Sequence, residues 1–234
     1  MNNEIIWLAE MLINFFLIIL AYRLFGKWGL IMWIPVSVIL ANIQVVQTVE
    51  LFGTVATLGN VVYATSFLVT DILSENYGKE EAKKAVWIGF FSLISMALLM
   101  NITLMYVPLA GDDFAVQTHE ATSTIFSLMP RIALASLAAY MLSQRHDVWA
   151  FHFWKKRFPK SRDLWIRNNL STMVSQLIDS GVFVLIAFLG VFETGMLLEV
   201  FLTTYFLKFI VAAADTPFVY WGKTIQKRGA FWLK

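Results

Sequence analysis

The sequence contains no cysteine and only three histidines, and just 15% of its 234 residues are charged. The absence of cysteine excludes disulfide bonds, thiolate metal sites, iron–sulfur clusters and cysteine nucleophiles. His119, His146 and His152 form neither an HxxxH nor an HExxH pattern, so a zinc site is not expected. We therefore expect neither a metal nor a cofactor to take part in the function.

Hydrophobic residues make up 59% of the chain and give it a mean hydropathy of +0.67. They come in runs of about 20 residues, the length of a helix that crosses a bilayer. We predict an all-α polytopic membrane helix bundle of about seven spans. The expected spans are Ile5–Leu24, Gly29–Leu51, Thr54–Tyr77, Ala85–Val107, Thr124–Gln144, Asn168–Phe192 and Met196–Trp221.

The basic residues are sorted by loop. Apart from Arg131 and Lys208, every lysine and arginine lies within residues 23–27, 79–84, 145–167 or 223–234, which follow alternate spans. Because basic loops stay on the cytoplasmic side, this pattern predicts an outside N-terminus and a cytoplasmic C-terminus. The first span has no basic residue before it and no cleavage site after it, so we expect a retained helix rather than a signal peptide.

Polar and ionisable residues interrupt several spans, and such residues mark functional sites because placing them in lipid costs free energy. Asp71 and Glu75 are four residues apart and share a helix face. Asp179 ends a polar stripe along the sixth span, and Lys208 and Asp215 share a face of the seventh. Pro217 predicts a kink in that last span. The same residues can also be read as ion pairs that only fix helix order, but acids, bases and amides in several spans together indicate a shared polar cavity.

Several segments resemble the queuosine precursor transporter family, also called the vitamin uptake transporter family. They occur in the expected order between about Leu40 and Gly222. The segments are Ser66–Lys84 (SFLVTDILSENYGKEEAKK), Arg131–Tyr140 (RIALASLAAY), Ser143–Val148 (SQRHDV), Asn168–Ser180 (NNLSTMVSQLIDS) and Lys208–Pro217.

The resemblance implies a bacterial or archaeal inner-membrane importer of 7-deazaguanine bases, the precursors of the tRNA nucleoside queuosine. It also implies a six-helix core similar to the S-components of energy-coupling-factor transporters. On this basis residues 1–27 form an additional N-terminal helix, residues 28–222 the core, and residues 223–234 a basic cytoplasmic tail. The second span lacks an AxxxA docking pattern, so we expect no ATPase partner; a homo-oligomer is compatible with the sequence.

A guanine-like base offers two adjacent donors on its edge, which one carboxylate can accept, and a carbonyl that needs a donor. Asp179 or Asp71 is the expected acceptor, and Arg131, Lys208 or Asn42 the expected donor. Phe67, Tyr140 and Tyr205 are candidate stacking partners. The full set of expected substrate-binding residues is Asn42, Asp71, Glu75, Arg131, Gln144, Gln176, Asp179, Lys208 and Asp215.

Three alternatives to a self-sufficient transporter follow from the same residues. A substrate-binding subunit for a vitamin or nucleobase uptake system would share the fold but need an energising partner. A membrane-embedded enzyme would need a compact catalytic cluster, for which only Asp71, Glu75 and Lys79 qualify. A structural protein would use its buried charges for stability alone. We expect a transporter that binds a small molecule and the lipid bilayer, is not an enzyme and does not bind nucleic acid.

Overall fold

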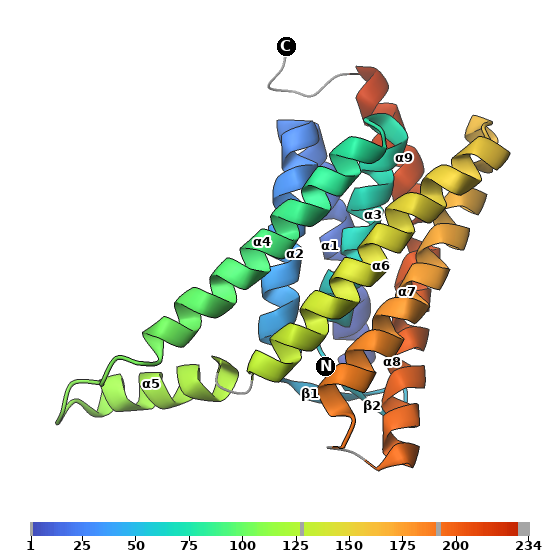
Figure 1. The fold of residues 1–234 in the computed structure, drawn as a ribbon. Helices are drawn as coiled ribbons and strands as arrows, with labels where there is room; N and C mark the ends of the chain where they lie inside the picture. The colour runs from blue at the N-terminus through green and yellow to red at the C-terminus, as the bar shows by residue number, and fades with distance from the viewer. Residues whose placement is uncertain (1, 127–128, 191–192, 229–234) are drawn as a thin grey trace.

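The computed structural model describes residues 2–126, 129–190 and 193–228, which form a bundle of long helices with one small hairpin (Figure 1). The elements are α1 (Asn3–Phe25), α2 (Lys27–Gln44), β1 (Thr48–Leu51), β2 (Thr54–Thr57), α3 (Asn60–Asn76), α4 (Lys79–Thr103), α5 (Asp113–Phe126), α6 (Met129–Arg157), a 3-10 turn (Ser161–Asp163), α7 (Leu164–Phe188), α8 (Thr194–Ala214) and α9 (Thr216–Arg228).

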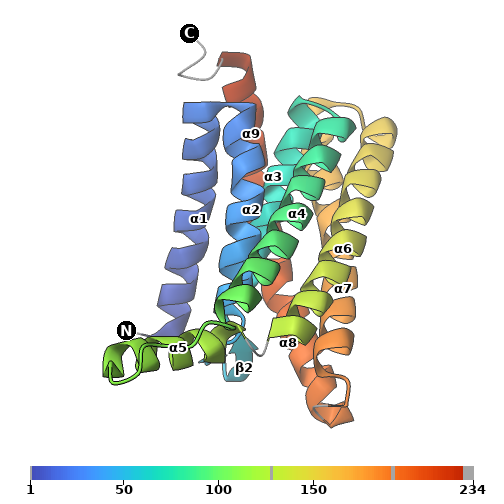
Figure 2. The same cartoon turned by 60° about the vertical axis from the view of Figure 1, so that its left-hand side comes forward.

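In the described part of the chain, α1 begins and α9 finishes at opposite ends of the bundle (Figure 1). We call the end with the N-terminus, the β-hairpin and α5 the hairpin end. The other end, where α9 finishes, carries Lys79, Lys155 and Lys223, and we call it the basic end. Figure 2 shows α5 lying across the hairpin end, beneath α1 and α2.

Five described helices are long and apolar enough to cross a membrane: α1, α2, α4, α8 and a helix that joins the 3-10 turn to α7. A sixth candidate combines Asp113–Phe126 with Pro130–Arg157, which are bent by 41°. The remaining predicted span corresponds to α3, which has 17 residues. Every residue of α3 from Asn60 to Ser74 is buried. The polar third span predicted from the sequence is therefore enclosed by the other helices.

Residues 48–57 correct the predicted helical boundaries, because they form an antiparallel β-hairpin instead of the ends of two spans. Thr48 pairs with Thr57 and Leu51 with Thr54. The turn residues Phe52 and Gly53 both have positive φ, 53° and 75°, as a two-residue hairpin turn of the primed type requires. Threonine and valine in both strands favour this conformation over a helix.

Other predicted boundaries were also wrong. The fourth span begins earlier, at Lys79, and the segment 144–157, predicted as a loop, continues α6. Residues 113–126 form α5, where the Asp112 carboxylate accepts a hydrogen bond from the Ala115 amide at 3.1 Å and caps the helix. The predicted kink near Pro217 is confirmed, because α8 ends at Ala214 and α9 begins at Thr216. The predicted sixth span ends at Phe192, which lies outside the described residues. The predicted seventh span starts at Met196, two residues after α8 begins at Thr194.

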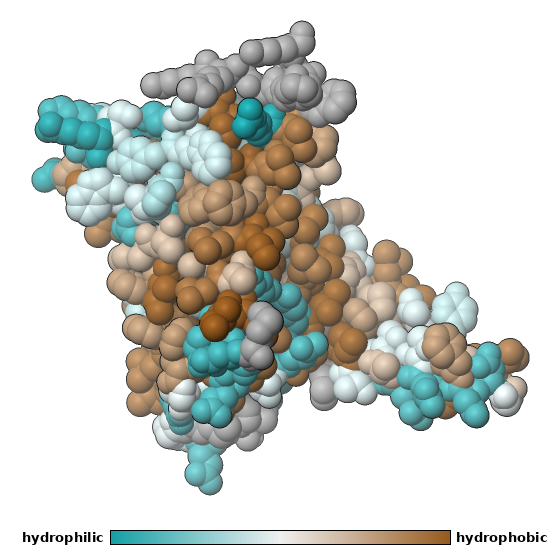
Figure 3. All heavy atoms as spheres, turned by 180° about the vertical axis from the view of Figure 1, so that it is seen from behind, coloured by the Kyte–Doolittle hydropathy of each residue, from teal (hydrophilic) through white to brown (hydrophobic). Residues whose placement is uncertain are grey.

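The outer surface of the bundle is apolar, as expected for helices in lipid. Phe91, Leu98 and Leu99 on α4 are more than half exposed, as are Ile13 and Phe16 on α1. In Figure 3 hydrophobic atoms fill the middle height of one face and hydrophilic atoms gather toward its two ends. The chain is therefore a multi-pass membrane protein whose polar side chains are gathered inside.

Candidate substrate site

The carboxylate of Asp179 on α7 is the centre of a buried polar cluster. Its Oδ1 accepts hydrogen bonds from the hydroxyls of Tyr63, at 2.6 Å, and Ser143, at 2.9 Å. Its Oδ2 is paired with the ammonium group of Lys208 on α8, which also lies 4.8 Å from the centre of the Tyr63 ring. Residues from α3, α6, α7 and α8 thus converge on one carboxylate, which is the arrangement that a buried charge requires.

A cavity of about 30 Å3 adjoins this cluster. Its wall includes Asn42, Asn60, Tyr63, Asp179 and Lys208. That volume holds about two water molecules, whereas sites for small molecules usually have about 300–1,000 Å3. The cavity is therefore too small for a bicyclic base, and we call this arrangement the closed form because its walls must move before a base can enter.

Buried amide groups near Asp179 have hydrogen-bonding atoms without a partner among the described residues. The Asn42 amide donates to the Val38 carbonyl at 2.8 Å, but its oxygen is unpartnered. The Gln144 amide donates to the Ser66 hydroxyl at 3.0 Å, and its oxygen is unpartnered. Both amide atoms of Gln176 are unpartnered. Buried polar groups are normally satisfied, so these three amides have bonding capacity left for a ligand.

The polar residues on α3 and α7 meet in layers along the bundle. Asp179 contacts Tyr63 in the first layer, and Thr172 donates to the Asp71 carboxylate at 2.9 Å in the next. Residue numbers fall on α7 as they rise on α3, because the two helices are antiparallel. At 1.5 Å per residue, Asp71 lies about 12 Å along α3 from Tyr63. Asp71 and Asp179 are therefore too far apart to bind the same base edge.

The second layer contains three buried carboxyl groups: Asp71 on α3, Asp147 on α6 and Asp215 between α8 and α9. Thr70 donates to Asp147 at 3.3 Å, and Asn168 donates to Asp215 at 2.6 Å. Within the described residues no lysine or arginine forms an ion pair with any of the three. Ionising a buried carboxyl group without a cation is costly, so these acids are suited to carrying protons.

The third layer, at the basic end, surrounds Glu75. Its carboxylate pairs with Lys223, with Arg167 at 3.0 Å and with Lys155 at 3.2 Å. Arg167 is fully buried and also donates to the Phe158 carbonyl at 3.1 Å. These contacts join α3, α6, α7 and α9, so the Glu75 carboxylate holds the helices together through three cations.

The structure therefore separates the residues that the sequence grouped. It places Asn42, Asp179 and Lys208 in the wall of one cavity, and leaves Gln144 and Gln176 buried with free atoms. It does not bring Arg131 to this cavity. The Arg131 side chain is exposed and donates to the carbonyls of Ile186, at 2.8 Å, and Leu189, at 2.5 Å, where α7 ends.

Sequence reasoning missed Tyr63, Ser143, Asp147 and Arg167. Tyr63 lies eight residues before Asp71, on a related face of α3, and that spacing could have revealed it. Asp147 and Arg167 were read as parts of a basic loop, although Asp147 continues the Tyr140–Gln144 helix face. Of the predicted stacking residues, Tyr140 and Phe67 flank Tyr63 with ring centroids 5.9 and 6.3 Å away, while Tyr205 contacts Phe209.

A small cavity among buried charged groups within a multi-pass membrane bundle is typical of transporters of small molecules. The sequence model of the family described as "Putative vitamin uptake transporter" matches residues 57–222. The chain belongs to this family, as its resemblance to the family's motifs predicted.

Named relatives extend this finding over the chain. A protein of Bacillus subtilis (strain 168) named "Probable queuosine precursor transporter" is 44% identical over 95% of this chain and 96% of its own length. The "Queuosine precursor transporter" of Escherichia coli (strain K12) is 28% identical over 74% of each chain. A Haemophilus influenzae protein named "Probable queuosine precursor transporter" is 28% identical over 57% of this chain and 52% of its own. No solved structure matches.

Proposed function

We propose that this protein imports queuosine precursors, the 7-deazaguanine bases 7-cyano-7-deazaguanine or its aminomethyl analogue, across the bacterial or archaeal inner membrane. The observation that carries the proposal is the buried Asp179–Lys208 pair beside unpartnered amides, in a chain that is 44% identical to a protein named for this cargo. The sorting of basic residues supports an N-terminus outside and a C-terminus in the cytoplasm.

The chemistry of the Asp179 cluster suits a guanine-like edge. A carboxylate has about four acceptor positions, and Tyr63, Ser143 and Lys208 occupy three of them in the closed form. We infer that the two edge donors of the base displace one of these partners from Asp179. Lys208 is the partner whose release is useful, because its ammonium then donates to the base carbonyl.

The remaining groups recognise the rest of the base in this proposal. Gln176 and Asn42 offer free amide atoms from α7 and α2, and Tyr63 with Tyr140 offers aromatic rings for the flat face of the base. We assign Asp71 and Asp215 to proton handling instead of base recognition. Glu75 and Arg131, which were expected at the site, serve the structure of the bundle.

7-Cyano-7-deazaguanine is uncharged and gains nothing directly from the membrane potential, so its import proceeds by facilitated diffusion or by coupling to protons. The layer of Asp71, Asp147 and Asp215, with no paired cation in the described part of the chain, favours proton coupling. Accumulation of base in vesicles should then follow an inward proton gradient and collapse with a protonophore. Equal uptake with and without the gradient would establish facilitated diffusion.

The alternative to a self-sufficient importer is a substrate-binding subunit that needs an energising partner, with a vitamin or another nucleobase as cargo. The family's description names vitamin uptake, which supports a vitamin as the cargo. A catalytic role has less support, because the family and its relatives are named for transport. We propose a six-helix core from residue 28 to residue 222, to which α1 is added. Testing this chain alone distinguishes a self-sufficient importer from a partner-dependent subunit.

The test is uptake of radiolabelled 7-cyano-7-deazaguanine by cells that lack queuosine synthesis and their own importer and express this protein alone. We expect uptake that unlabelled precursor competes and guanine does not. Asp179→Asn should abolish it, because an amide cannot accept both edge donors, while Arg131→Gln serves as a matched control outside the cavity. Absence of uptake by folded wild-type protein would favour a partner-dependent subunit or another cargo.

A further inference from the structure

A second, larger cavity lies between α4 and α6 near the basic end. It has a volume of about 510 Å3, within the range of sites that hold small molecules. The two helices meet at Gly89, where an added Cβ would lie 2.5 Å from the Tyr140 hydroxyl. The cavity lies closer to the basic end than this crossing. It is lined by Lys79, Lys83, Val86 and Trp87 of α4 and by Gln144, Arg145, His146, Val148 and Trp149 of α6.

The lining of this cavity is basic and aromatic. Three basic side chains contribute, Lys79, Lys83 and Arg145, and none of the described lining residues is acidic. Lys83 pairs with Glu80 at 3.1 Å, but both side chains are exposed, and such pairs contribute little to stability. Lys79 and Arg145 form no ion pair among the described residues. The cavity therefore has positive charge available for an anion.

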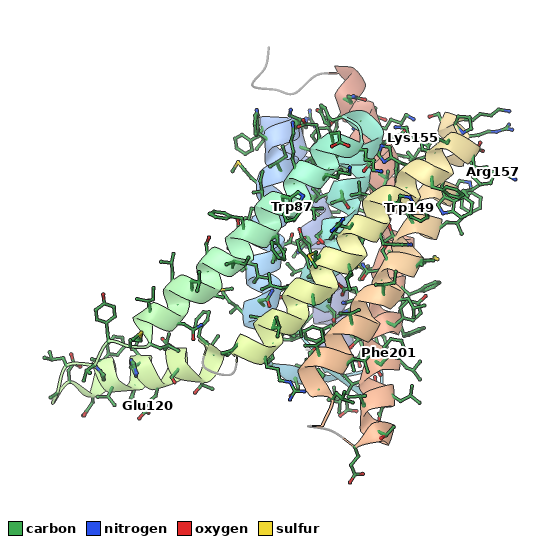
Figure 4. All side chains as sticks on the ribbon, viewed as in Figure 1. Trp87, Glu120, Trp149, Lys155, Arg157 and Phe201 are labelled. Carbon is green, nitrogen blue, oxygen red and sulfur yellow. The ribbon has the colours of Figure 1, made fainter. Side chains whose placement is uncertain are left out.

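Tryptophan places this cavity at the level of the lipid headgroups. Trp87 and Trp149, which are 56% and 54% exposed, line it from the two helices. Both are labelled in the half of the bundle toward the basic end (Figure 4). Exposed tryptophan in membrane proteins is enriched at the membrane–water interface. Val86 and Val148 add apolar wall, and Gln144, whose amide oxygen has no partner among the described residues, also lines the cavity.

We propose that the cavity between α4 and α6 is a binding site for one anionic phospholipid. Its phosphate contacts Lys79, Lys83 and Arg145, its glycerol region lies between the two tryptophans, and a headgroup hydroxyl donates to Gln144. Basic pockets between membrane helices bind anionic headgroups in this way. A guanine-like base has no negatively charged group for three cations to bind, so this site differs from the Asp179 cavity. The proposal does not depend on which cargo is carried.

The test is native mass spectrometry of the purified full chain in detergent, titrated with phosphatidylglycerol or with phosphatidylcholine of the same acyl chains. We expect saturable binding of one phosphatidylglycerol that phosphatidylcholine does not match. The variant Lys79→Gln/Lys83→Gln/Arg145→Gln should lose about 100-fold in affinity for phosphatidylglycerol. This is the combined loss expected when three basic residues near an anionic headgroup are removed.

The matched control is the variant Lys156→Gln/Arg157→Gln/Lys160→Gln, which removes the same charge from the basic end but outside the cavity. It should bind phosphatidylglycerol as the wild type does. Should the first triple variant fail to fold, the single variant Arg145→Gln should still weaken binding about 5-fold. Equal losses in the control and cavity variants, or equal binding of the two lipids, would overturn the proposal. Displacement of the lipid by equimolar glycerol phosphate or by the deazaguanine base would overturn it as well, since either would make the cavity a site for a soluble molecule.

Discussion

The ammonium group of Lys208 and the carboxylate of Asp179 stabilise each other inside the bundle, and neither is exposed enough for water to replace the other. Removing one partner of a buried pair leaves an uncompensated charge, which typically costs about 3–5 kcal/mol. We therefore expect Lys208→Met to lower the thermal stability of the purified protein strongly. The free energy of unfolding in detergent, measured by circular dichroism during denaturation, checks this.

The double variant Asp179→Asn/Lys208→Met separates stability from function at the same site. It contains no unpaired charge, so we expect most of the stability to return while uptake of the base stays lost. If the double variant is as unstable as Lys208→Met alone, charge pairing is not what the lysine contributes. Recovery of uptake would instead show that neither group contacts the cargo.

Arg131 provides the opposite case, a charged residue in a predicted span that lies outside the cavity. Its guanidinium binds the carbonyls of Ile186 and Leu189, which α7 leaves without helical partners at its end. We expect Arg131→Gln to lower stability by about 1–2 kcal/mol, through loss of charged hydrogen bonds, and to leave base affinity unchanged. A binding titration that shows a tenfold loss of affinity would contradict this placement.

At the scale of elements, Gly89 sets how closely α4 approaches α2 and α6. A Cβ at this position would lie 2.5 Å from both the Ile34 methyl and the Tyr140 hydroxyl, so those groups must move. We expect Gly89→Ala to destabilise the protein by about 1–3 kcal/mol, the usual range for overpacking. Thermal unfolding of the purified variant measures the effect.

Gly181 on α7 is the matched control for this substitution. An added Cβ there meets only Phe201, at an ordinary contact distance of 3.6 Å. Because alanine favours a helix over glycine by about 1 kcal/mol, Gly181→Ala should be neutral or stabilising. Equal destabilisation by both substitutions would mean that the crossing at Gly89 is not specially close.

Helices and their order followed from the sequence because lipid imposes a simple rule: apolar runs of sufficient length cross the membrane. The hairpin did not follow, since its threonines and valines are also hydrophobic enough to extend a span. Asp147 and Arg167 were missed for a related reason. They belong to a stretch rich in basic residues, and only the packing of α6 and α7 against α3 shows that these two side chains turn inward.

The sequence predicted the kinds of residue that form the candidate site better than it predicted which residues belong to it. Asp179, Lys208 and Asn42 were identified because charged or amide groups within apolar spans are unusual. Which of the nine candidates share a cavity depends on how far along each helix they lie and how the helices pair. Spacing within one span gives the first quantity, but only tertiary structure gives the second, and so the sequence could not show that Asp71, Glu75 and Arg131 lie outside the lining of the Asp179 cavity.

For the whole molecule, the proposed orientation can be tested without altering any native cysteine, because the chain has none. A single cysteine at Asn2 should react with an impermeant maleimide added to intact spheroplasts. One at Lys156, which is exposed near the basic end, should react only after permeabilisation. The opposite labelling pattern would invert the topology and place the basic end outside the cell.

The small volume beside Asp179 bears on ion leakage. The cavity has room for about two water molecules, which is less space than a hydrated sodium or chloride ion occupies. An importer that rests in this form would therefore exclude hydrated ions from its Asp179 cavity while it waits for a base.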